Sequence, residues 1–284
     1  MNSSFLLSVI TFVYGLSAVL YVSMWIFKKD LPGKAALWAA VIGLCGNMAG
    51  ILLRWIESYQ MGYGHAPLSN LFESLIFFAW SIVAIYLFVE YRTQNKTIGA
   101  FVMPIAFLAM AYASLSPNIS DRIQPLIPAL KSNWLIAHVI TCFLGYAGFA
   151  VAFGISIMYI LRPKTPQNGN GENSGSLLSR LPLRDVLDDL NHKMVQFGFL
   201  FLSVGIITGA VWANSAWGRY WGWDPKETWS LITWFLYATL LHARLMRGWH
   251  GKKIAYISIA GFMAVLFTYF GVNLLPGLHS YGAQ

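Results

Sequence analysis

Residues 134–161 read WLIAHVITCFLGYAGFAVAFGISIMYIL and contain no Asp, Glu, Lys or Arg. A helix needs about 20 predominantly apolar residues to cross a hydrocarbon core roughly 30 Å thick. The stretch therefore predicts a membrane-spanning helix. The whole chain has the same character, because 57% of its 284 residues are hydrophobic and 11% are charged, against about 25% charged in an ordinary soluble domain.

Apolar blocks of about this length recur along the chain, and the sequence shows no internal repeat and no sizeable soluble domain. We therefore expect an all-α integral membrane protein with about eight transmembrane helices. The blocks are residues 5–27, 35–53, 70–90, 98–115, 134–161, 194–213, 229–247 and 254–275.

The distribution of basic residues predicts the orientation. The N-terminal MNSS has no basic residue, whereas Lys28, Lys29 and Lys34 follow the first block, so this block is not a cleaved signal peptide. Lysines beside a span stay in the cytoplasm, and alternating from there places fourteen basic residues inside and five outside. We expect both termini outside. The net charge of +8 is mostly this topological signal, and no basic run suggests nucleic acid binding.

The two cysteines, Cys45 and Cys142, lie inside different spans. The chain has no CxxC and no CxxCH motif, which excludes a dithiol redox motif and a c-type haem attachment site of its own. Both are interpreted as packing residues.

The loops differ between the two sides of the membrane. Inside, residues 162–193 begin with a polar Gly/Asn/Ser run that is typical of a flexible linker. They continue as LPLRDVLDDLNHK, whose apolar spacing predicts a short amphipathic helix on the inner membrane face. Outside, the substantial loops are 54–69, 116–133 and 214–228, beside the tail 276–284.

The six histidines separate by position. His192 and His250 lie among cytoplasmic basic residues and are interpreted as surface residues. His242 follows Trp229 by thirteen residues, which places it about 20 Å along the helix, in the inner half of the bilayer. An ionisable group at that depth predicts a functional site, although a neutral imidazole bonded to a neighbouring helix would explain it equally well.

His138 and His279 lie at the outer face, in or next to the spans that bracket the loop containing WGRYWGWDPKETW, residues 217–229. Two histidines beside clustered tryptophans suggest axial ligands to haem, since imidazole binds iron and indoles stack on a porphyrin. Zinc fits less well, because no cysteine or carboxylate cluster completes a tetrahedron. An interfacial aromatic belt explains Trp25, Trp38, Trp55, Trp80, Trp134 and Trp249. A belt needs none of the glycines that accompany Trp217, Trp221 and Trp223.

The same stretch, followed by SLITW, resembles the tryptophan-rich WWD signature of haem-handling proteins, in particular the CcsA (ResC) family of system II cytochrome c biogenesis. GHAPLSNLFESL at 64–75 and GVNLLPGLHSYG near the C-terminus resemble that family too. The resemblance covers most of the chain from residue 64 onward. Residues 64–284 are thus expected to be the six-helix assembly core with WWD loop 214–228, and residues 1–63 two further transmembrane helices.

The resemblance implies that the WWD loop binds haem at the outer surface between His138 and His279, and that His242 serves a second haem position within the membrane. Trp217, Trp221 and Trp223 would cover the ring. Arg219 and Lys226 are candidates to pair with the propionates, with interfacial snorkelling as the alternative. Asp224 is expected to fix the loop, and His65 lies in a family-like motif without being one of the usual ligands.

The function implied is delivery of non-covalent haem b and its attachment to the CxxCH segment of apocytochrome c. A CcsB (ResB) partner would supply the other membrane histidine, so that this chain would be one subunit of the cytochrome c synthase, and a thiol-reducing protein would serve the cysteines. The expected location is the bacterial cytoplasmic membrane or the thylakoid membrane. The rival function is a quinol-oxidising cytochrome b, which requires paired histidines at both depths, whereas only His242 lies deep. A transporter leaves the aromatic loop unexplained.

Overall fold

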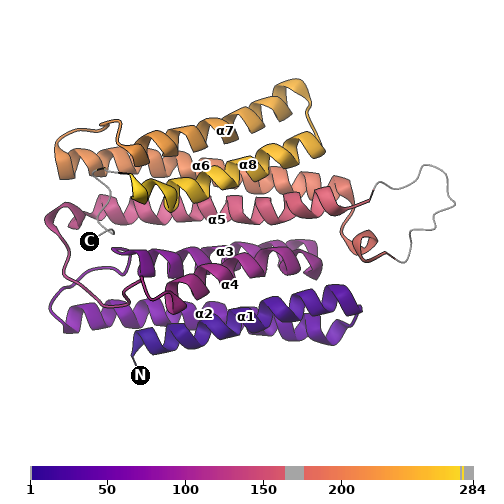
Figure 1. The fold of residues 1–284 in the computed structure, drawn as a ribbon, viewed down its shortest axis with the longest axis horizontal. Helices are drawn as coiled ribbons and strands as arrows, with labels where there is room; N and C mark the ends of the chain where they lie inside the picture. Colours follow the sequence, from indigo (N-terminus) through magenta and orange to yellow (C-terminus); the bar gives the residue numbers. More distant parts are fainter. Residues whose placement is uncertain (1, 164–175, 276, 278–284) are drawn as a thin grey trace.

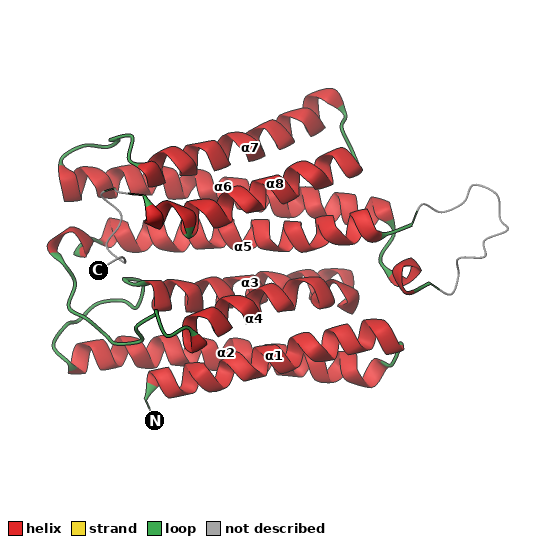
Figure 2. Cartoon of the chain, viewed as in Figure 1, coloured by secondary structure: helices red, strands yellow, loops and turns green. Residues whose placement is uncertain are grey.

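The computed structural model describes residues 2–163, 176–275 and 277, and within these ranges it contains helices, turns and loops but no strand (Figure 2). The expected linker falls largely outside the described residues. The long helices are α1 Ser3–Phe27, α2 Asp30–Gln60, α3 Leu71–Thr93, α4 Gly99–Leu115, α5 Asn133–Leu161, α6 Arg184–Trp217, α7 Pro225–Arg247 and α8 Lys252–Tyr269. Short 3-10 turns are η1 Lys96–Ile98, η2 Pro128–Leu130, η3 Leu177–Arg180 and η4 Gly271–Leu274.

The long helices lie side by side and alternate in direction (Figure 1). Helices α1–α4 form one half and α5–α8 the other, with α3 and α4 in contact with α5. The α2–α3, α4–α5 and α6–α7 connections meet at one end, here called the aromatic end. The α1–α2, α3–α4, α5–α6 and α7–α8 connections meet at the opposite, basic end.

The composition of the helices confirms an all-α membrane protein. Of the described helices, seven are long and apolar enough to cross a membrane, and α7 is the long helix that does not meet this criterion. Helix α7 nevertheless packs along α8 and α6 (Figure 1). Its polar residues at both ends and its exposed His242 lower its hydropathy.

The short amphipathic helix expected on the inner membrane face is wrong in one respect. Residues 184–193 are the first turns of α6 and continue without a break into the spanning segment. Leu187 and Leu190 are buried and pack inside the bundle, whereas Leu183 and Val186, the other apolar residues of the predicted face, are exposed.

Helices α5 and α6 form the most extensive pair in the bundle. A Cβ placed on Gly145 of α5 would lie 2.9 Å from the backbone nitrogen of Leu202 on α6, which is closer than real Cβ contacts. Small residues permit this approach of two backbones, a common mode of helix packing in membranes. The pair forms the rigid support of the aromatic end.

A buried ion pair braces the same end in the other half. Arg54 Nε of α2 lies 2.7 Å from Glu73 Oε1 of α3, with side-chain exposures of 2% and 1%. Glu73 also accepts hydrogen bonds from the backbone N–H and hydroxyl of Ser69, while Asn70 caps α3. The family-like motif at 64–75 therefore contains a structural joint between α2 and α3.

Candidate functional site

The aromatic loop is shorter in the structure than the expected 214–228. Helix α6 ends at Trp217, where Gly218 takes the left-handed conformation (φ 74°) that glycine adopts without steric cost. Helix α7 begins at Pro225. The loop proper is therefore residues 218–224, and Lys226 lies in the first turn of α7.

A capping box fixes the loop to α7. Asp224 Oδ1 accepts the backbone N–H of Lys226 at 2.9 Å. Glu227 Oε2 accepts the N–H of Asp224 at 3.2 Å and that of Gly222 at 2.7 Å. Asp224 is buried, and its carboxylate holds backbone, the loop-fixing role expected for it. Glu227 was not among the expected site residues, although an acid three positions after an N-cap Asp is a known capping signal.

The indoles of the loop form an open aromatic surface. Trp223 is 69% exposed, and Trp221 packs edge-on against it with ring centroids 5.7 Å apart. Trp217 packs against Trp212 at 4.9 Å. Within the described residues the Nε1 of Trp221 is buried without a hydrogen-bond partner, which is costly in a protein. The loop thus has both an exposed indole, that of Trp223, and a buried N–H donor, that of Trp221.

His138 sits on α5 beneath this loop and is held by α6. Its Nδ1 lies 2.7 Å from the carbonyl oxygen of Gly205, and because a carbonyl only accepts, Nδ1 carries the proton. The lone pair of the neutral ring is then on Nε2, the arrangement typical of a metal-ligating histidine. The ring stacks on Trp212 at 6.0 Å and 14°.

Gly209 of α6 creates the space that His138 occupies. A Cβ at this position would lie 2.6 Å from His138 Nδ1 and 2.7 Å from Cε1. The imidazole also makes a hydrogen bond with Gly205, one turn before Gly209 on α6. It therefore cannot move closer to α6. The orientation of His138 therefore depends on a residue that the sequence did not single out.

Two cationic side chains lie near this histidine and the loop. Lys226 is half-buried and lies within electrostatic range of His138 and Cys142. Arg219 is exposed and packs against Gly222, where a Cβ would lie 2.7 Å from the guanidinium carbon. The aromatic surface is thus flanked by positive charge.

Gly277 lies against the start of α7. A Cβ placed on Gly277 would lie 2.6 Å from Asp224 Oδ2 and 3.2 Å from Pro225 Cδ. Gly277 therefore lies directly against the aromatic loop. His279 lies outside the described residues.

His242 lies on α7, far from the aromatic loop, and its side chain is exposed on the surface of the chain. It shares a helix face with other exposed residues whose spacing alternates between three and four, the pattern of a helix-packing seam. These are Ile232, Phe235, Thr239 and Met246. Within the described part of the chain, His138 and His242 are not brought together.

His65 is buried in the loop between α2 and α3. Its Nδ1 lies 3.0 Å from the carbonyl oxygen of Ala66 and its Nε2 lies 2.9 Å from that of Gln124. Both ring nitrogens thus face backbone acceptors, which leaves no lone pair directed at a metal. His65 ties the α2–α3 loop to the α4–α5 loop.

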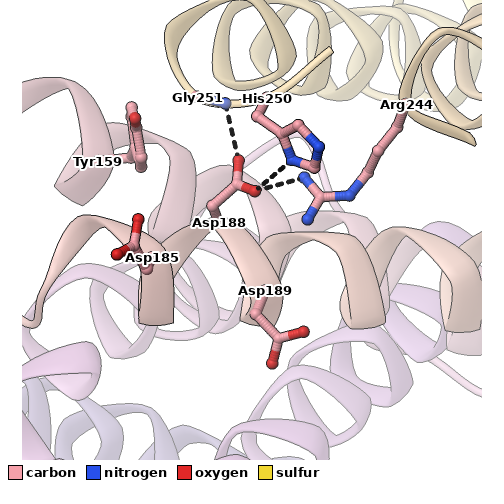
Figure 3. Close-up of a pocket in the computed structure, with 7 residues that line it drawn as sticks. All are labelled: Tyr159, Asp185, Asp188, Asp189, Arg244, His250 and Gly251. Carbon is pink, nitrogen blue, oxygen red and sulfur yellow. Dashed lines mark hydrogen bonds and ion pairs between the residues drawn. The ribbon is translucent and has the colours of Figure 1, made fainter. Parts of the chain in front are cut away.

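A pocket of about 440 Å³ opens at the basic end (Figure 3). Asp188 at its centre accepts the N–H of Gly251 at 2.9 Å and lies 2.6 Å from Arg244 and 3.2 Å from His250. It therefore joins α6 to α7 and to the α7–α8 turn. The lining contains three carboxylates, which would repel an anionic ligand, so we interpret it as a structural joint. The lining residues are Tyr159, Asp185, Asp188, Asp189, Arg244, His250 and Gly251.

Both the sequence and the fold are similar to those of known proteins. Residues 68–279 match the family described as "Cytochrome C assembly protein". Curated relatives named "Cytochrome c biogenesis protein CcsA" include one from Microcystis aeruginosa, 37% identical over 99% of this chain and 96% of its own length. Those from Guillardia theta and Pyropia yezoensis are 40% identical (92% of this chain, 91% of the relative) and 38% identical (97% of each).

A solved structure titled "Cytochrome c Heme Lyase CcmF" has a similar fold, with a TM-score of 0.68 at 16% sequence identity. The similarity covers 96% of this chain and 51% of the solved one. The chain thus spans about half the length of that protein, and at this identity the likeness shows the fold alone.

Proposed function

This chain belongs to the cytochrome c assembly protein family, and from that premise we propose that it carries haem and presents it for attachment to apocytochrome c. The relatives that share more than a third of its residues over nearly its whole length are cytochrome c biogenesis proteins. They lend no support to a quinol-oxidising cytochrome b.

The observation that supports this proposal most is the environment of His138. A histidine whose Nδ1 donates to a backbone carbonyl keeps Nε2 as a ligand of fixed orientation. Here the donor is Nδ1 of His138 and the acceptor is the carbonyl oxygen of Gly205. The ring lies next to Trp212, which packs against Trp217 at the aromatic loop. We assign His138 as one axial ligand of haem iron.

The aromatic loop offers contacts for the porphyrin ring and for the propionates of the haem. The exposed indole of Trp223 stacks on the porphyrin face. Trp221, whose ring lies at 88° to that of Trp223, and Trp217 complete the aromatic cover around it. Arg219 and Lys226 are the donors for the propionates, while Asp224 keeps the loop in place.

We assign His279 as the second axial ligand. Its support is the sequence position of His279, two residues after Gly277, which touches the start of α7.

We assign His242 to a second haem position inside the membrane, completed by a partner. An exposed imidazole and the neighbouring Thr239 are costly against lipid, so a protein helix covering this face of α7 would satisfy them. That helix would belong to a CcsB-like partner and carry the opposing histidine. Residues 1–63 would be an accessory helix pair beside the core 64–284.

The chemistry is addition of two thiols to two vinyl groups. In each addition the S–H bond breaks, sulfur bonds one vinyl carbon and the proton is added to the other, so nothing is released and no oxidant is needed. This chain supplies positioning and exclusion of water, which lower a barrier when the geometry is well held, and acts as a subunit of the synthase. A thiol-reducing protein keeps the cysteines of apocytochrome c reduced.

The aromatic end faces the outside of a bacterial cytoplasmic membrane or the thylakoid lumen. This orientation follows the positive-inside rule, because most basic residues lie at the basic end. Haem therefore enters near His242 and leaves at the aromatic end.

The proposal is tested by the haem that the complex contains. We expect the complex of this chain with its partner, purified in detergent, to hold haem that acidified solvent extracts and that gives a b-type pyridine haemochrome spectrum, because the chain has no CxxCH to bind it covalently. A complex without haem, or with haem retained only covalently, would contradict the proposal.

Gly209→Ala should reduce haem content per complex about tenfold, the usual cost of disturbing the residue that orients a metal ligand. The new methyl group displaces His138 from Gly205 without removing the imidazole. Haem per purified complex is compared with that of Gly46→Ala, where the new Cβ meets the end of the Ile10 side chain in the other half of the bundle. An equal haem content in the two variants would show that Gly209 does not position His138.

A further inference from the structure

Glu227 holds the backbone on both sides of Trp223. Its Oε2 accepts the N–H of Gly222, the residue before Trp223, and the N–H of Asp224, the residue after it. One carboxylate oxygen therefore closes a short turn around a single residue. A cap needs only the second of these bonds, so the bond to Gly222 calls for a separate explanation.

The residue inside this turn has an unusual conformation. Trp223 has φ 57°, in the left-handed region that bulky residues rarely adopt. Backbone strain of this kind persists only where the surroundings enforce it, and it is concentrated at functional sites. The effect here is to place the indole outward, 69% exposed, with the ring of Trp221 packed edge-on against it.

We propose that Glu227 is a positioning residue for the haem platform: it enforces the left-handed turn that presents the indole of Trp223 to the haem ring. The inference rests on the proposed function, because it assumes that haem binds this surface. It adds a carboxylate that touches neither iron nor propionate: besides capping α7, Glu227 acts on the haem through Trp223. Asp224 has a different role, since its side chain caps Lys226 and does not contact Gly222 in the described hydrogen bonds.

The test is a double-mutant cycle on the complex with its partner, with haem per purified protein as the measurement. Glu227→Ala is expected to lower haem about fivefold, in line with the loss of one well-placed aromatic contact. Trp223→Ala is expected to do the same. If Glu227 acts through Trp223, the double variant should lose no more haem than Trp223→Ala alone. Glu227→Gln, which keeps an acceptor oxygen, should restore most of the haem.

The control is Asn95→Ala, which removes a cap bond to Thr97 at the basic end and should leave haem unchanged. Haem in Glu227→Ala equal to wild type, or losses that multiply in the double variant, would overturn the inference. If Glu227→Ala does not accumulate, Glu227→Asp replaces it in the cycle, because the shorter side chain withdraws the carboxylate from Gly222. A wild-type complex without haem would instead contradict the proposed function itself.

Discussion

Replacing His138 with alanine is expected to abolish holocytochrome formation while the protein accumulates normally. The imidazole lies in a space that α5 and α6 leave between them, so on the proposed assignment its removal deletes an iron ligand and leaves the two helices packed. Added imidazole should restore part of the activity, because it can occupy the vacated axial position if the tryptophan platform still holds the ring. The measurement is covalent haem on a co-expressed c-type cytochrome, with and without imidazole.

His65→Ala is the matched control for this experiment. It removes an outer histidine whose two ring nitrogens face the carbonyls of Ala66 and Gln124, and therefore it cannot act by deleting an iron ligand. Imidazole should not rescue any loss that it causes. Unimpaired maturation in His138→Ala would remove His138 from the ligand set.

The second large effect is expected for His242→Ala, which should lower the total haem of the complex further than His138→Ala does. His242 lies near the basic end of α7 and His138 near the aromatic end of α5, so haem that enters from the basic end meets His242 first. Loss of the entry ligand empties both positions, whereas loss of the outer ligand leaves the entry position able to fill. Pyridine haemochrome content per complex measures the difference.

Thr239→Ala provides the control for His242, because it lies one turn away on the same exposed face of α7 without being a metal ligand. It should disturb partner contact at most and leave the haem ratio between the two positions unchanged. Equal or higher haem in His242→Ala than in His138→Ala would contradict the order of the two sites and the passage of haem across the membrane.

Much of the fold could be predicted because hydropathy is a local property of the sequence. Apolar blocks such as 134–161 are separated by polar loops, and the alternation of basic residues gives an orientation. The inner boundary of α6 could not be found in this way, since the burial of Leu187 depends on neighbouring helices. An amphipathic segment has the same sequence pattern on a membrane surface as in a bundle.

The candidate site was predictable only in its residue types. Clustered tryptophans, and histidines at the two depths, are visible in the sequence. The packing environment of His138 is not visible in the sequence, because it depends on Gly205 and Gly209 of α6. The sequence does not show which residue of α5 a glycine on α6 contacts. Glu227 is visible in the sequence as an acid three positions after Asp224. This pattern predicts the start of a helix, but it does not predict the hydrogen bond from Gly222.

The central claim is that His138 ligates haem iron beneath the aromatic loop. The most direct measurement is the electron paramagnetic resonance spectrum of the oxidised complex, compared between wild type and His138→Ala with and without ¹⁵N-imidazole. The proposed two-haem arrangement predicts that His138→Ala loses the part of the low-spin bis-imidazole signal that belongs to the outer haem and keeps the part that belongs to the haem at His242. The lost part should return, with coupling to the labelled nitrogen, when imidazole is added. An unchanged low-spin signal in His138→Ala would contradict the claim.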